Sequence, residues 1–580
     1  MSRTAEKGRG WPGPIPLLGL LIVGAAALTF WETRGQSLYA DEVTIFSSYR
    51  GWDPGVLLRP DGGHLILTTL LVYKTLWQIF GAESYLPLRI LHVVLASISA
   101  GLFYQLARTR IGDYPALAPT ALVVLFGSAG EIVATPFGSL AYGSVIFGLA
   151  ALLALERGGR RGDVIACICL IGALASYSIS IAFLVGAAVL VYLRGPAMRR
   201  RSAWVIAAPV LLYAAYRIYA LHYGGHGETN ISLDNVGNLP SAMLTELAAA
   251  AAALSGLFRV PGQQGVSFDI SWGYPIGVAL VGLVAFRLRD RAPVSPRLWA
   301  LLATLLAFWG LIALNLGPLR APDASRYVYI AGLLMLLVLI ELLAEARLAR
   351  LELAGIAVLL AGSILANVVA LHETAPQYRT AGRILRGDLA GVEIAGRNAD
   401  PNLPILELPD EPVVRDLQIP VHDYLAAAAD LGSPAYSPDE LAAAPETPRA
   451  AADAQMIRLL GLHTAAESAL PPPPATPPVA TEAVRGGTVT VRAGCVVLEP
   501  TGPGANLVLR LPPGGVSLRV APGASASVAL RRFADAFAAP LAPVAGGTSA
   551  VVAIPRDRVA RPWEASITAD QKVEACPVPA

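Results

Sequence analysis

The stretch that decides the fold is residues 31–64, WETRGQSLYADEVTIFSSYRGWDPGVLLRPDGGH. It follows the first strongly apolar run, residues 14–30, and it is too polar to enter a bilayer. Two carboxylates, Asp41 and Glu42, stand side by side near its start, in a segment rich in aromatic residues. We therefore expect a loop at a membrane surface that forms the floor of a functional site.

The composition around this loop is that of an integral membrane protein. Of 580 residues, 54% are hydrophobic and only 15% are charged. Apolar runs near the length of a membrane span, about 20 residues, recur from residue 14 to residue 371 and then stop. The net charge of +2 is close to neutral and gives no indication of nucleic-acid binding.

The short basic loops predict which side of the membrane each segment faces, because cytoplasmic loops carry the excess of Lys and Arg. With about eleven crossings, every strongly basic short loop falls on the cytoplasmic side, as does the N-terminus. We expect the first span to remain uncleaved. Two apolar helices, 65–80 and 240–257, are expected at the interface. The expected spans are 14–30, 85–106, 114–129, 138–155, 164–177, 179–193, 203–221, 272–286, 298–314, 327–344 and 353–371.

The chain divides by composition into a membrane part, 1–371, and an extracytoplasmic remainder. Within the remainder, 372–470 predicts mixed helix and loop, and the proline-rich 471–480 predicts a stiff spacer. Residues 481–580 alternate short β-prone runs with Gly and Pro turns, which is typical of a small antiparallel β domain. Cys495 and Cys576 lie in this last part; outside the cytoplasm they are free to form a disulfide or to remain unpaired.

Asp41 is the candidate general base, with Glu42 as its neighbour or substitute. A carboxylate at this position suits transfer to a hydroxyl, which is a poor nucleophile until its proton is removed. The alternative is that both acids are simply solvated after a span. The nearby aromatic residues, which suit the faces of sugar rings, favour the functional interpretation.

A phosphate leaving group would need cations, and arginine forks match phosphate oxygens well. Arg326 and Arg320 lie in the external loop before the tenth span, Tyr327 begins that span, and Arg89 lies near the outer end of the second. The alternative is that these arginines extend to the lipid headgroups.

Asp61 and His64 are two further candidates, in the segment RPDGGH. They either shape the site or flank a plain glycine turn. We find no convincing set of metal ligands in the sequence.

These features resemble the GT-C superfamily of polytopic glycosyltransferases, which includes protein O-mannosyltransferases and lipid A aminoarabinose transferases. The resemblance rests on the acidic pair Asp41-Glu42, on the run GGHLILTTLLVYKTLWQIFGAESYLPLRILHVVLA at 62–96, and on SRY at 325–327, and it covers about 1–371. It implies a GT-C-like fold, a polyprenyl-phosphate-linked sugar as donor, Asp41 as base and inversion at the anomeric carbon. Some members use a divalent metal and others do not, so metal dependence is open.

The expectation is a multi-pass plasma-membrane glycosyltransferase that acts on the outer face and moves a sugar to a glycan, lipid or protein acceptor of the cell envelope. Two alternatives belong to other classes: a transporter or flippase for a lipid-linked glycan, and a non-catalytic scaffold for envelope assembly. A transporter predicts internal repeats and ionisable groups at mid-membrane, of which the sequence shows none and few respectively.

Overall fold

The computed structural model divides the chain into two compact units. The helical unit comprises Met1–Gln36, Gly51–Phe80 and Tyr85–Arg379, and the C-terminal unit comprises Ser37–Arg50, Gly81–Ser84 and Thr380–Ala580. The structure describes residues 13–39, 41–193, 195–223, 233–258, 269–289, 294–317, 320–344, 349–405, 419–467, 481–492, 494–537 and 539–578. The expected spacer 471–480 lies outside these residues.

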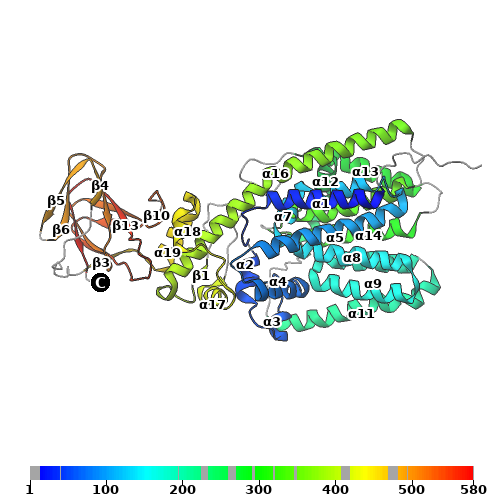
Figure 1. The fold of residues 1–580 in the computed structure, drawn as a ribbon, viewed down its shortest axis with the longest axis horizontal. Coiled ribbons are helices and arrows are strands. Elements are labelled where there is room, and N and C mark those ends of the chain that lie inside the picture. The colour runs from blue at the N-terminus through cyan, green and yellow to red at the C-terminus, as the bar shows by residue number, and fades with distance from the viewer. Residues whose placement is uncertain are drawn as a thin grey trace, which may run out of the picture. The chain divides into compact units, whose positions relative to one another are not determined.

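Helices make up the regular structure of the helical unit, and α5, α8, α9 and α11 run side by side in it (Figure 1). The longer helices are α1 (Pro14–Glu32), α4 (Leu67–Phe80), α5 (Leu86–Ile111), α8 (Ser139–Arg157), α9 (Gly159–Ser176), α10 (Ile181–Leu193), α11 (Pro196–Ala220), α12 (Leu239–Ser255), α13 (Gly273–Arg289), α14 (Pro296–Ala313), α15 (Ser325–Leu343) and the first part of α16 (Arg350–Ala395). The shorter ones are α3 (Pro54–Leu57), α6 (Leu117–Val124), η1 (Gly127–Ala129), α7 (Gly130–Val133), η2 (Pro136–Gly138), η3 (Ser178–Ser180), η4 (Leu221–Tyr223) and η5 (Leu233–Asn238).

A helix occupies each of the eleven expected spans. Within the described residues, seven helical segments are long and apolar enough to cross a membrane, so the chain has the character of a multi-pass membrane protein. The remaining expected spans coincide with α6, α9, α10 and α13, which are shorter or carry more charge near one end. The count of eleven therefore stays a prediction. The seven segments are Pro14–Glu32, Leu86–Ile111, Pro136–Arg157, Arg199–Tyr223, Pro296–Ala313, Ser325–Leu343 and Arg350–Asn398.

The segment 130–137, between the third and fourth expected spans, is expected to be a short external loop, but nearly all of it is buried. The preceding turn packs tightly against α16: a Cβ on Gly127 would lie 2.0 Å from the Asn367 carbonyl oxygen. Asn367 also accepts hydrogen bonds from the backbone N–H and the hydroxyl of Ser128, at 3.0 and 2.8 Å. This close approach draws the segment into the helical core, and Glu131 is drawn in with it.

The alanine-rich helix α12 is also more deeply packed than an interfacial helix would be. Each residue from Leu247 to Ala253 is buried, so no polar face is left exposed along those two turns. The helix packs against α13, α14 and α15, and small side chains allow that close approach. It is therefore part of the helical core.

The C-terminal unit joins a helical part to a β part. Its helices are α2 (Asp41–Ser48), the end of α16, η6 (Gly396–Asn398), α17 (Val421–Leu431), α18 (Pro438–Ala443) and α19 (Glu446–Leu459), with the two-stranded pair β1 (Pro404–Ile405) and β2 (Ile419–Pro420). The remaining strands are β3 (Thr464–Glu467), β4 (Thr481–Arg485), β5 (Gly487–Arg492), β6 (Cys495–Pro500), β7 (Ala505–Arg510), β8 (Val516–Val520), β9 (Ser525–Arg531), β10 (Ala539–Pro540), β11 (Val544–Ala545), β12 (Ser549–Val552), β13 (Glu564–Ala569) and β14 (Val573–Pro577).

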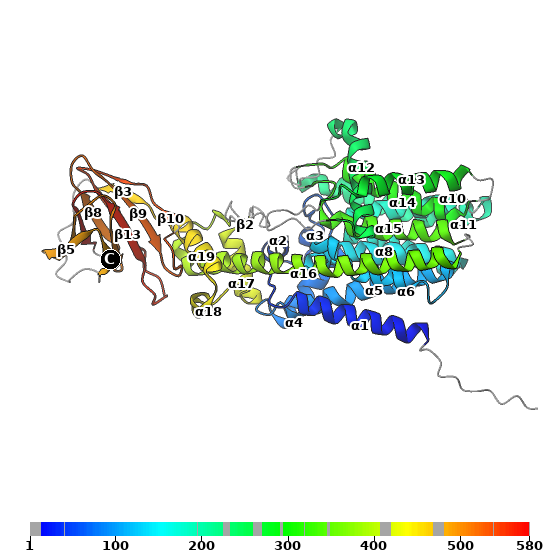
Figure 2. The same cartoon turned by 90° about the horizontal axis from the view of Figure 1, so that it is seen from above.

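The β part confirms the expected antiparallel strands and arranges them in two sheets, which Figure 2 shows from above. One sheet has the order β10-β9-β13-β7-β4, with β11 also paired to β9, and the other has the order β3-β12-β8-β14-β6-β5. Side chains of β13 alternate between buried and half-buried, as expected for a strand with one face on a core. Cys495 and Cys576, from the neighbouring strands β6 and β14, form a disulfide.

The first-loop helix α2 belongs to the C-terminal unit, although the sequence placed it in a continuous membrane part ending at 371. It packs against α17, where the rings of Phe46 and Tyr424 lie 6.0 Å apart. Because these two segments are nearly 400 residues apart in the chain, local sequence patterns give no sign of this contact.

Candidate functional site

The acidic pair of the first loop lies at the start of α2. Glu42 is fully buried, and its Oε2 accepts a hydrogen bond from the Tyr39 backbone N–H at 2.9 Å. It thus satisfies one of the unpaired N–H groups at the start of the helix, which is a structural role. Asp41, by contrast, is half-buried at the first position of the helix. Of the two acids, Asp41 is the better placed to meet a ligand.

Arg89 joins two helices of the helical unit. Its guanidinium donates to the carbonyl oxygen of Phe30 and lies 4.0 Å from the centre of the Phe30 ring. It also donates to the Thr33 hydroxyl at 3.4 Å. These contacts hold the end of α1 against α5, so the structure gives Arg89 a packing role, and its predicted phosphate contact stays a prediction.

Arg326 forms an ion pair inside the helical unit. Its Nη1 lies 3.1 Å from Oε1 of Glu131, and both side chains are largely buried. The Glu131 backbone N–H also donates to the hydroxyl of Ser325 at 3.4 Å. A buried carboxylate needs such a partner, so Arg326 neutralises Glu131. Its predicted phosphate role stays a prediction.

The segment Asp61–His64 forms the tight turn that the two glycines allow. The backbone N–H of each end residue donates to the carbonyl oxygen of the other, at 2.9 and 2.8 Å. Gly62 and Gly63 have φ angles of +50° and +81°, the left-handed conformations that a type I′ turn requires. The turn fixes the position of His64, whose ring lies 4.5 Å from that of Tyr177 and hydrogen-bonds the Ser178 hydroxyl.

His64 lines a cavity of about 280 Å³ in the helical unit, together with two other predicted residues, Arg320 and Tyr327. Its other polar lining residues are Tyr177, Ser178, Tyr213, Arg217 and Asn315. No Asp or Glu is among the described residues that line it. We call this cavity the cationic pocket.

The two arginines of the cationic pocket have donor groups to spare. Nη1 of Arg320 is buried and has no hydrogen-bond partner within the part of the chain that the structure describes. Arg217 donates from Nη1 to the Gly63 carbonyl oxygen at 3.0 Å. A buried guanidinium nitrogen without an acceptor is costly, so the pocket is suited to a ligand that brings anionic oxygens.

The electrostatics of the pocket keep His64 neutral. Burial, together with the positive charges of Arg320 and Arg217, lowers the pKa of His64 from 6.5 to about 3. At physiological pH the neutral ring therefore carries one donor and one acceptor nitrogen, and the positive charge comes from the arginines.

Sequence reasoning missed Arg217, Tyr213 and Asn315. The sequence feature that could have indicated the first two is a row of tyrosines on α11, where Tyr213, Tyr216 and Tyr219 repeat every three residues beside Arg217. Asn315 offers a second unsatisfied group: its Oδ1 is buried without a hydrogen-bond partner among the described residues. An acceptor of this kind suits a ligand hydroxyl.

A separate groove of about 410 Å³ is lined by residues of five helices of the same unit, α10, α12, α13, α14 and α15. All of its described lining residues have apolar side chains or are tryptophans. Helix α14 lines both the groove and the cationic pocket, with residues 299–309 at the groove and residues 311–312 at the pocket. Helix α15 likewise contributes residues 335–342 to the groove and Tyr327 to the pocket. Among the groove residues are Leu280 and Val284 of α13, Trp299, Leu302 and Leu306 of α14, and Leu339 of α15.

Comparisons of the chain with protein-family models, curated proteins and solved structures found no match.

Proposed function

We propose that the chain is a membrane glycosyltransferase that takes a sugar from a polyprenyl-phosphate donor and transfers it to an acceptor hydroxyl of the cell envelope. The observation that carries the proposal is the buried, unpartnered Nη1 of Arg320 in the cationic pocket. Arg217 adds a second positive charge, and His64 adds a neutral hydrogen-bonding group. Such a pocket is complementary to a phosphate.

The phosphate is the leaving group of the proposed reaction. As the bond from the anomeric carbon to the phosphate oxygen breaks, its electron pair moves to that oxygen, and negative charge grows there. Arginine donors fixed at that position stabilise the charge more in the transition state than in the bound donor. The tyrosines around the pocket offer ring faces and hydroxyls to the sugar.

The apolar groove supports a lipid-linked donor rather than a soluble sugar nucleotide. From Leu311 to Trp299, α14 runs about 18 Å at 1.5 Å per residue, so a chain that leaves the pocket along this helix meets apolar side chains. An isoprenoid tail has no hydrogen-bonding groups and is stabilised by burial on such a surface.

The general base in this proposal is Asp41, on the argument from the sequence. It would take the proton of the acceptor hydroxyl while the oxygen attacks the anomeric carbon opposite the phosphate, which inverts that centre. The described lining of the cationic pocket supplies no carboxylate, and His64, with a pKa of about 3, is a weak base. The disulfide Cys495–Cys576 supports placing the C-terminal unit outside the cytoplasm, where disulfides persist.

The test is turnover by the purified full-length protein in nanodiscs. Incubated with a polyprenyl-phosphate sugar and envelope glycan, the protein is expected to release lipid phosphate. Asp41→Asn is expected to slow the release by about 100- to 10,000-fold while leaving the thermal unfolding temperature unchanged. Full activity of this variant would rule out Asp41 as the base. Movement of the intact donor across the membrane of proteoliposomes without release would identify a flippase, and binding alone would identify a scaffold.

A further inference from the structure

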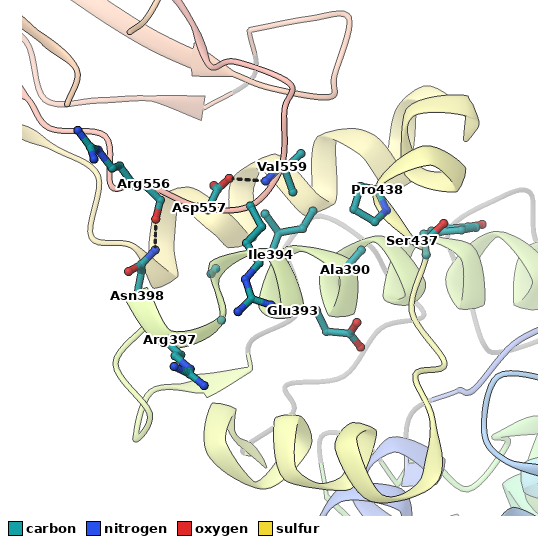
Figure 3. A pocket seen from close by; sticks show the side chains of 14 residues that line it. Ala390, Glu393, Ile394, Arg397, Asn398, Ser437, Pro438, Arg556, Asp557 and Val559 are labelled. Carbon is teal, nitrogen blue, oxygen red and sulfur yellow. Dashed lines mark hydrogen bonds between the residues drawn. The ribbon is translucent and has the colours of Figure 1, made fainter. Parts of the chain in front are cut away.

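A second cavity, of about 540 Å³, lies within the C-terminal unit. Its walls are the last turns of α16 with η6, the segment that enters α18, and the loop between β12 and β13 (Figure 3). Helical and β parts of the unit thus meet at it. We call this cavity the arginine cleft.

The loop that forms one wall of the cleft is held in place from behind. The buried side chain of Arg532 binds both carboxylate oxygens of Asp557, at 2.5 and 2.8 Å, and donates to the Val559 carbonyl oxygen at 3.1 Å. Across the cleft, Nδ2 of Asn398 donates to the Arg556 carbonyl oxygen at 2.9 Å (Figure 3). The wall is therefore preorganised, so a ligand would not have to order it.

Three arginines give the cleft its charge: Arg397 from η6, and Arg556 and Arg558 from the loop. All three are exposed, and within the described residues none has an ion pair or a side-chain hydrogen bond. The charge of Asp557 is compensated by its buried arginine partner. The remaining acid, Glu393, accepts hydrogen bonds from two hydroxyls through one carboxylate oxygen. Positive charge therefore predominates in the lining.

The cleft also holds a fixed aromatic ring. The ring of Tyr436 lies 4.0 Å from the guanidinium carbon of Arg386, which is itself held by the backbone oxygens of Pro434 and Ala435, at 3.1 and 3.3 Å. One face of the ring is thus taken up by a cation, and its remaining surface contributes to the cleft. An ordered aromatic surface beside hydrogen-bonding groups suits the apolar face of a sugar ring.

We propose that the arginine cleft binds an acidic polysaccharide, a chain of sugars that carry carboxylate groups. The arginines come from two separate elements, so a ligand with repeated carboxylates can contact both. Arginine guanidinium groups donate paired hydrogen bonds to carboxylates, and Tyr436 supplies the sugar-facing surface. This binding is independent of the donor site in the helical unit.

The experiment measures binding of two oligosaccharides of equal length to the full-length protein in nanodiscs. Oligogalacturonate is the acidic probe and an oligodextran is the neutral one. We expect the acidic probe to bind at least about tenfold more tightly, since each charged hydrogen bond contributes about 1.5–3 kcal/mol. Its affinity should fall as salt rises from 50 to 500 mM, because exposed charges are screened.

Matched double variants locate the site. Arg397→Ser with Arg558→Ser should weaken oligogalacturonate binding by about tenfold or more. The control, Arg485→Ser with Arg492→Ser, removes the same charge from exposed positions on β4 and β5 and should leave it unchanged. Equal binding of both probes, binding of neither, or equal losses in the two variants would overturn the proposal. The comparison of probes needs only the wild-type protein, so it stands even if a variant fails to fold.

Discussion

Replacing Arg320 with glutamine is expected to weaken binding of the lipid phosphate without destabilising the ligand-free protein. The buried Nη1 of Arg320 donates to nothing within the described residues, so the substitution removes no hydrogen bond from that nitrogen. With a phosphate bound, the same nitrogen would make a charge-assisted hydrogen bond. Such bonds contribute about 1.5–3 kcal/mol, which corresponds to a loss of about 10- to 150-fold in affinity.

The assay is titration of a polyprenyl phosphate into the protein in nanodiscs, with thermal unfolding measured in parallel. Arg320→Lys keeps the charge but loses the fork, so an intermediate loss is expected. Arg34→Gln is the control: Arg34 is an exposed arginine of the same unit that donates to the Trp31 carbonyl oxygen at 2.7 Å and does not line the pocket. Unchanged affinity in Arg320→Gln would refute the phosphate assignment, and a lowered unfolding temperature would show that the arginine is structural.

Three further predictions concern stability. Arg326→Leu should destabilise the helical unit by about 3–5 kcal/mol, because it leaves the buried Glu131 without its ion pair, and adding Glu131→Leu should restore much of the loss; an unfolding midpoint unchanged by the single variant would contradict this. The pKa of His64 is lower in the folded than in the unfolded protein, so its contribution to folding stability is present above pH 6.5 and is lost as pH falls toward 3. Lowering the pH from 7.5 to 5 should therefore reduce the free energy of unfolding of the wild type by about 2 kcal/mol more than that of His64→Gln. An equal pH dependence of stability in the two proteins would argue against the shift. Reducing the disulfide Cys495–Cys576, which joins positions 81 residues apart, should destabilise the C-terminal unit by about 4 kcal/mol, and an unfolding temperature insensitive to reductant would contradict this.

The helical spans and the β strands were predictable because each is encoded locally. An apolar run near the length of a membrane span, about 20 residues, indicates a helix by its length alone, and short β-prone runs between Gly and Pro turns indicate strands whatever their partners. The glycine turn before His64 was visible in the same way, as RPDGGH. The sequence also placed Arg320 in the loop before the tenth span, and the structure shows that this arginine lines the cationic pocket.

The distinction between Arg320 and Arg326 was not predictable, since these two arginines of identical chemistry lie only six positions apart. Only packing decides that Arg326 pairs with Glu131, nearly 200 residues away, while Nη1 of Arg320 is left without a partner in the described structure. Arg217 was missed for a related reason: the tyrosines beside it mark one face of α11, but they do not show that this face lines a pocket with α14.

By itself, then, the sequence determined the elements: the apolar helices, the strands, and a first loop with an acidic pair. Tertiary structure decided the roles, because a charge is structural or available according to what lies within a few ångströms of it. Glu42 and Asp41 are neighbours in the chain, yet Glu42 is fully buried and accepts a hydrogen bond from a backbone N–H, whereas Asp41 is half-buried. Where the deciding contact joins distant segments, as between Arg326 and Glu131, local sequence patterns do not encode it.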